Sequence, residues 1–75
     1  MEKIDYQYKE QLGGSTVVTH NGDVIVTFVD SSLGQLAFSC WRHSMLIHHA
    51  RKNEVFRLQN YDTGEYLTGT LEDLV

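Results

Sequence analysis

The chain has 75 residues, a net charge of −4 and a pI of about 5.4. This length suits a single small domain over 1–75, because a second hydrophobic core would need a longer chain. Six Lys and Arg residues are too few for the clustered phosphate contacts of a nucleic-acid-binding protein, so we expect no direct binding to DNA or RNA.

Cysteine content and hydropathy indicate the cellular setting. Cys40 is the only cysteine, so no disulfide can form within the chain. A lone cysteine suits a reducing compartment, and we expect a cytoplasmic protein. Residues 1–5 carry charge where the apolar part of a secretory signal would begin. The longest stretch without a charged side chain, 31–41, is far shorter than the roughly 20 apolar residues of a membrane span, so we expect no membrane partner.

The N-terminal arm, 1–12, alternates apolar and polar residues. Ile4, Tyr6 and Tyr8 occupy every second position, as in a half-buried strand. Ile4, Tyr8 and Leu12 would also fit one side of a short helix. We favour the strand, and we expect it at an edge of the sheet.

The clearest local signal is a hairpin over 17–28. Two runs rich in β-branched residues flank Asn21 and Gly22. This dipeptide suits a two-residue type I′ turn, because both of its residues tolerate a positive φ. We therefore expect two antiparallel strands here.

The segment 31–53 contains no acidic residue, and its basic groups gather at its C-terminal end. Its apolar periodicity predicts a helix over 32–52. Asp30, Ser31 or Ser32 can cap the start of this helix, and the helix dipole favours positive charge at its end.

The helical prediction assigns one side of the segment to the core. That side contains Leu33, Leu36, Ala37, Cys40, Ser44 and Ile47, with Trp41 and His48 at its edge. The opposite side contains Gln35, Ser39, Arg42, His43 and His49. In the all-β alternative the same segment forms two strands of a small barrel, and Gly34 would favour it by weakening a helix by about 1 kcal/mol relative to Ala.

A second hairpin is predicted after this segment. Its strands are 55–59 and 65–68, and 61–64 supplies a turn in which Asp and Gly hold suitable positions. The elements together predict an α+β fold: a four- or five-stranded antiparallel sheet with one helix on one face, in the order β-β-β-α-β-β.

The sequence offers two weak chemical motifs. Asp62-Thr63-Gly64 matches the catalytic triplet of aspartic proteases, but its flanking residues differ and the chain has no second lobe, so a turn explains it better. Cys40 and His43 have a zinc-compatible spacing, yet no second cysteine or nearby acid completes a site. A cysteine on the predicted core side is also unreactive. We expect no enzyme, no metal and no cofactor.

Interaction with a protein is the function that this pattern favours. Trp and Arg most often dominate the energetics of interfaces, and Tyr6, Tyr8, Tyr61 and Tyr66 add aromatic surface that could belong to the exposed face of the sheet. The residues expected to bind a partner are Trp41, Arg42, His43, His49, Arg51 and Lys52.

Small, acidic, cysteine-poor chains are common among phage-encoded inhibitors, including anti-CRISPR proteins. We therefore expect an inhibitor or modulator that occupies the surface of a partner protein, for example one in a nucleic-acid-binding complex, whose basic groove would attract an acidic domain. The alternative is an accessory nucleic-acid or ligand-binding module that uses the His/Arg/Lys-rich helix end. A homodimer is a further option, because a small core gains by burying a sheet edge against a second copy.

Overall fold

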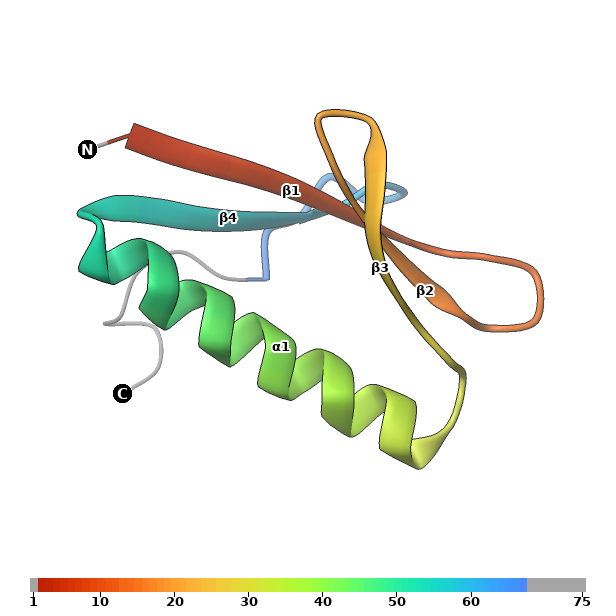
Figure 1. Ribbon diagram of the computed structural model, residues 1–75. Helices are drawn as coiled ribbons and strands as arrows, with labels where there is room; N and C mark the ends of the chain where they lie inside the picture. The colour runs from red at the N-terminus through yellow and green to blue at the C-terminus, as the bar shows by residue number, and fades with distance from the viewer. Residues whose placement is uncertain (1, 68–75) are drawn as a thin grey trace.

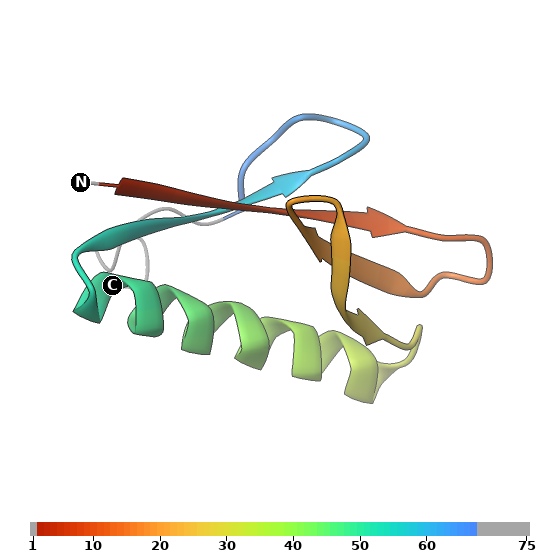
Figure 2. The ribbon, with the colours of Figure 1, turned by 45° about the horizontal axis from the view of Figure 1, so that its top comes forward.

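The computed structural model describes residues 2–67, which form four strands and one helix (Figure 1). The strands are β1 (Glu2–Glu10), β2 (Thr16–His20), β3 (Asp23–Phe28) and β4 (Glu54–Asn60). Helix α1 (Ser32–Arg51) joins β3 to β4. The strands make one sheet in the order β3-β2-β1-β4, and α1 covers one of its faces (Figure 2). The α+β class, with one helix on one face of the sheet, is confirmed.

The sheet is mixed, so the prediction of antiparallel pairing throughout is wrong. β1 pairs antiparallel with β2, and β2 with β3, but β1 and β4 run parallel from the pair Glu2–Glu54 to the pair Tyr8–Asn60. The cause is the connection: a helix of 20 residues, about 30 Å long, returns the chain to the end of the sheet where β3 began. The strand that follows it must therefore run in the direction of β3 and β1.

The N-terminal arm forms a strand, but it does not lie at an edge. β1 lies between β2 and β4, and pairs with both. The last strand instead pairs on the free side of β1, which leaves β3 as the outer strand at the other end of the sheet.

The predicted hairpin is confirmed in its turn and in its pairing. Asn21 has φ 52° and Gly22 has φ 85°, the two positive values that a type I′ turn requires. Val18 pairs with Val26 and Thr19 with Val24, so Ile25 is the extra residue of a β-bulge.

Helix α1 is confirmed, and the all-β alternative is wrong. Ser31 is the N-cap, and its Oγ accepts a hydrogen bond from the Gly34 N–H at 3.0 Å. Gly34 belongs here despite its low helix propensity, because a Cβ at this position would lie 1.8 Å from the carbonyl oxygen of Val29. Asn53, with φ 58°, takes the left-handed position after the last turn.

The side of α1 that faces the sheet differs from the predicted one. The sheet side contains Gly34, Phe38, Trp41, Met45, Leu46 and His49. The side predicted to be buried is exposed along most of its length: Leu33 is 78% exposed, Leu36 60%, and Ala37, Cys40 and Ser44 are also exposed, while Ile47 is half-buried. Both sides of the helix carry apolar residues, so periodicity alone could not choose between them.

The second predicted hairpin is only partly present. Asn60 Oδ1 accepts hydrogen bonds from the N–H groups of Asp62 and Thr63, and Gly64 has φ 77°, so the predicted turn is confirmed. The chain then returns to β4 through one bridge between Gln59 and Tyr66 rather than through a strand. The predicted strand 65–68 is therefore reduced to a bridge within residues 65–67, and residue 68 lies outside the described residues.

The core lies between the sheet and α1. Its buried members are Tyr6 of β1, Val18 of β2, Leu46 of α1, and Phe56 and Leu58 of β4. Complete burial of one such side chain contributes about 1.5–3 kcal/mol. Aromatic rings of α1 and β3 surround this group and extend it toward the N-terminal end of the helix. Within residues 2–67, no helix combines the length and apolar character that a membrane span requires.

Candidate functional site

The six residues predicted to bind a partner do not share one surface. Trp41 is half-buried on the sheet side of α1, where its ring meets the edges of Tyr6 and Phe56. Its aromatic contacts are therefore those of a core residue. His49 is buried in the same interface. The remaining four lie elsewhere on the helix, so the group is divided between the interior and the solvent.

Arg42 is half-buried beside the aromatic cluster. Its guanidinium carbon lies 5.2 Å from the ring centroid of Phe38, and Nη2 donates to Ser39 Oγ at 3.4 Å. His43, Arg51 and Lys52 are exposed. Of these, Arg51 and Lys52 line a shallow hollow at the C-terminal end of α1, together with Ser44, Ile47 and His48.

A hydrogen-bonded network joins Tyr6, the buried His49 and Glu54. His49 Nε2 lies 3.0 Å from the Tyr6 hydroxyl, and Nδ1 lies 3.0 Å from Glu54 Oε1. The imidazole also stacks on Phe56, with an interplanar angle of 4°. Burial, and secondly the negative charge of Glu54, raise the pKa of Tyr6 above its ordinary value. Tyr6 is only 7% exposed, so this network satisfies buried polar atoms rather than contacting a substrate.

Sequence reasoning missed this hydrogen-bonded network because it placed His49 on the solvent side of the helix. The signal that could have found it is the spacing of His49 from Phe38, Trp41 and Met45, which places all four on one side of a helix. The prediction of a buried Cys40 fails for the same reason: its thiol is exposed.

Within residues 2–67, neither chemical motif is joined by the further side chains that its chemistry would need. Asp62 and Thr63 lie in the exposed turn after β4. Cys40 and His43 are both exposed on α1. Among residues 2–67, no group of three or more His, Cys, Asp or Glu side chains could hold a metal ion.

The face of the sheet opposite α1, which we call the open face, carries a polar array. Alternation along β1, β2 and β4 directs one set of side chains away from the core. Its polar members are Lys3, Asp5, Gln7, Lys9, Thr19, Arg57 and Gln59, and the apolar Val17 and Val55 share the same face. Because β1 and β4 are in parallel register, Asp5 lies opposite Arg57 and Gln7 opposite Gln59.

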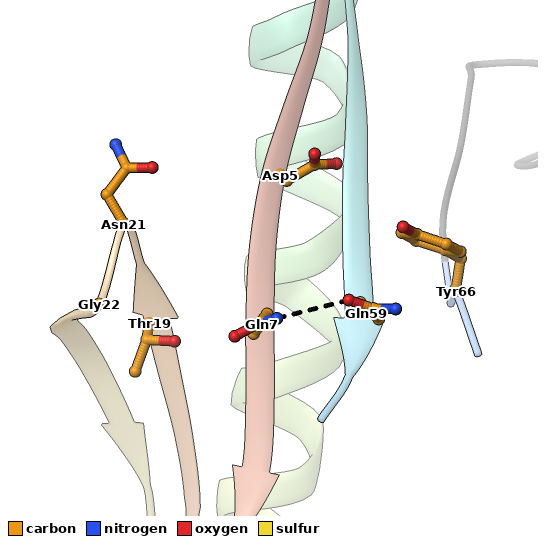
Figure 3. Close-up of a pocket in the computed structure, with 7 residues that line it drawn as sticks. All are labelled: Asp5, Gln7, Thr19, Asn21, Gly22, Gln59 and Tyr66. Carbon is orange, nitrogen blue, oxygen red and sulfur yellow. Dashed lines mark hydrogen bonds between the residues drawn. The ribbon is translucent and has the colours of Figure 1, made fainter. Parts of the chain in front are cut away.

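These opposed side chains interact directly across the two strands. Arg57 Nε lies 2.7 Å from Asp5 Oδ1, and Gln7 Nε2 donates to Gln59 Oε1 at 3.4 Å (Figure 3). The first contact is an ion pair between the exposed Asp5 and the partly buried Arg57, and its open side faces solvent, so it orients the two side chains more than it stabilises the fold.

Two tyrosines extend the open face beyond β4. The ring of Tyr66 lies 4.3 Å from the guanidinium carbon of Arg57, whose Nη2 also donates to the Tyr66 hydroxyl. Lys9 Nζ lies 4.8 Å from the ring centroid of Tyr61. Each tyrosine is about half exposed and paired with a cation. By contrast, the side chains of Tyr6 and Tyr8 pack on the side of the core.

A polar hollow of about 260 Å³ lies in the open face. Figure 3 shows Asp5 and Gln7 on β1 and Gln59 on β4, with Thr19 and Asn21 of the hairpin on one flank and Tyr66 on the other. Amide and carboxylate groups dominate its lining, so it suits hydrogen-bonding groups better than an apolar ligand.

Comparisons with known proteins assign the chain to no family. No family model matches it, and neither the curated proteins nor the solved structures contain a match.

Proposed function

We propose that this protein is a non-enzymatic interaction module that binds a partner protein through the open face and acts by occupying the partner's surface. The observation that carries the proposal is the pairing of half-exposed tyrosines with cations on this face, Tyr66 with Arg57 and Tyr61 with Lys9. Tyr and Arg are enriched in protein interfaces and among the residues that dominate binding energy. A tyrosine held by a cation also loses little conformational freedom on binding.

The polar hollow supports the same proposal. A partner's backbone or amide side chain would find donors and acceptors already held in position by the Gln7–Gln59 and Asp5–Arg57 contacts. Inhibition of a nucleic-acid-binding complex, a phage origin and a cytoplasmic location stay predictions from the sequence. Binding through the residues predicted from the sequence, which include Arg51 and Lys52 at the end of α1, also stays a prediction. Substitution of Arg51 and Lys52 tests it against the open face.

The test is affinity capture from a lysate of the source cells, with three baits. They are the wild-type chain, a Tyr61→Ala/Tyr66→Ala variant of the open face, and an Arg51→Glu/Lys52→Glu variant of the helix end. Because all four substituted side chains are exposed, neither variant is expected to unfold. We expect a captured protein that the helix-end variant retains and the tyrosine variant binds at least about tenfold more weakly.

The same experiment addresses the nucleic-acid alternative, for which the hollow beside Arg51 and Lys52 is the relevant feature. Capture is repeated after nuclease treatment and at raised salt, since binding through phosphates falls steeply with salt. Loss of the partner after nuclease treatment, or loss in the helix-end variant alone, would contradict binding through the open face.

A further inference from the structure

The outward side of α1 is apolar although no described residue covers it. Leu33 and Leu36 are largely exposed, Cys40 is exposed and Ile47 is half-buried. Together with Ser44 they occupy positions spaced by three and four residues, which is the spacing of a seam between two packed helices. We call these five residues the outer stripe: Leu33, Leu36, Cys40, Ser44 and Ile47.

The outer stripe is symmetric about Cys40. If a second copy of α1 lies antiparallel with Cys40 facing Cys40, then Leu33 faces Ile47 of the second copy and Leu36 faces Ser44. Large side chains then meet a partner along a seam of about 21 Å, the rise from Leu33 to Ile47. The small side chains of Cys40 and Ser44 lie near the axis of symmetry, where they allow the two helices to approach closely. A two-fold axis requires this self-complementarity.

The charges at the ends of α1 select the antiparallel direction. Asp30 stands just before the N-terminal end, whereas Arg51 and Lys52 occupy the C-terminal end, and all three are exposed. A parallel pair would bring the basic ends of both copies together, with repulsion between like charges. An antiparallel pair separates the basic ends by about the length of the helix, 30 Å, and places each beside the Asp30 of the other copy.

We infer that the outer stripe is the interface of a homodimer, in which a second copy of this chain docks antiparallel on α1 with the two-fold axis beside Cys40. The dimer leaves the open face of each copy uncovered, because α1 lies on the other side of the sheet (Figure 2). It does not depend on what the open face binds. The competing arrangement is pairing through β3, whose Val24 and Ile25 are exposed. There the β-bulge at Ile25 interrupts the ladder that a second strand would need.

The first test is the molar mass in solution, measured by size-exclusion chromatography with light scattering. We expect the wild-type chain to be a dimer and Leu36→Glu to be a monomer with an unchanged circular dichroism spectrum. Leu36 is 60% exposed, so the new acid leaves the core intact, and the unchanged spectrum excludes loss of the helix as the cause of dimer loss. The matched control, Ile25→Glu on the β3 edge, should stay a dimer.

Two results of this measurement would overturn the inference. One is a wild-type chain that is still a monomer at about 1 mM. The other is a dimer that survives Leu36→Glu and is lost in Ile25→Glu, which would place the interface on the sheet edge.

The second test examines the direction of pairing by thiol cross-linking with a short bismaleimide. The wild-type chain should cross-link through Cys40, whereas a Cys40→Ser/Asp62→Cys variant, with its thiol on the turn after β4, should not. In the Cys40→Ser background, a mixture of Leu33→Cys and Ile47→Cys chains should cross-link with each other. Efficient cross-linking of Leu33→Cys chains alone would indicate parallel pairing and contradict the inferred symmetry.

Discussion

Both sides of α1 carry apolar residues, but only one of them packs on the sheet. The sheet side presents Phe38, Trp41 and Met45, which pack on the core between the helix and the strands. The outward side presents smaller side chains at the same spacing, Leu33, Leu36 and Cys40, which the described part of the chain leaves exposed. Ring size and close backbone approach decide which side faces the sheet: aromatic rings fill the volume over the strands, and Gly34 lets the helix start close to Val29.

The comparison separates residues that fold the domain from residues available to other molecules. A chain of 75 residues has a small surface, and an apolar stripe exposed on it is unfavourable in water unless another surface covers it. The open face is different again, because its side chains are polar and already paired with one another. The molecule therefore presents an apolar outer stripe, which we propose binds a second copy, and a polar open face, which we propose binds a different partner.

The largest expected difference between the two sides comes from matched leucines. Leu46 is 1% exposed, and Leu46→Ala should lower the free energy of unfolding by about 2–5 kcal/mol, through lost burial and a cavity. Leu36→Ala should change it by no more than about 0.5 kcal/mol at low chain concentration, where a dimer adds no stability. Urea denaturation of both variants measures the difference. Equal losses would mean that the helix packs in another orientation.

A smaller effect is expected at the start of α1. Gly34→Ala adds a methyl group where the carbonyl of Val29 lies, so the helix start or the preceding loop must shift, at a cost of about 1–3 kcal/mol. The same change would stabilise an unhindered helix, because Ala has the higher propensity. Gln35→Ala, at an exposed neighbouring position, is the control and should be neutral or slightly stabilising. A stabilised Gly34→Ala variant in thermal denaturation would refute the close approach.

Adjacent histidines provide the next comparison. His49→Leu removes the hydrogen bonds to Tyr6 and Glu54 and should cost about 1–2 kcal/mol, because the Tyr6 hydroxyl stays buried without its partner. His48→Leu, at an exposed position, should change the free energy of unfolding by less than about 0.5 kcal/mol. Denaturant titrations at one neutral pH measure both changes in the free energy of unfolding. A larger decrease for His48→Leu than for His49→Leu would argue against the hydrogen-bonded network.

The features that follow from local chemistry were predictable from the sequence. Asn21 and Gly22 predicted the hairpin turn, and Ser31 and the periodicity of the segment after it predicted the helix. The direction of β4 follows from the length of the helix before it, but its place beside β1 was not predictable, because no local signal sets the order of strands in a sheet. The choice of helix side was also beyond periodicity, since both sides satisfy it.

The candidate site depended on the same missing information. Asp5 and Arg57 are 52 positions apart in the chain, as are Gln7 and Gln59, and both pairs exist only in the parallel register of β1 and β4. A sequence that does not reveal that register cannot show these contacts. The exposed tyrosines were visible as aromatic surface, but Tyr6 and Tyr8 had to be assigned to the core before Tyr61 and Tyr66 stood out.

Ionisation of Tyr6 has no effect on stability near neutral pH, but the raised pKa of this β1 residue makes the fold sensitive to alkali. The unfolded chain releases the tyrosine proton near pH 10, whereas the folded chain retains it to a higher pH. Folding therefore loses stability as the pH rises above about 10, by at most about 1.4 kcal/mol per pH unit from this group, and is unaffected well below it. Tyr6→Phe should be less stable than wild type at neutral pH, because it lacks the bond to His49, and its stability should fall less steeply between pH 10 and 11. Tyr61→Phe, at an exposed position, should follow the wild-type profile, so parallel profiles for all three chains in urea denaturation at stepped pH would contradict the burial of the Tyr6 hydroxyl beside Glu54.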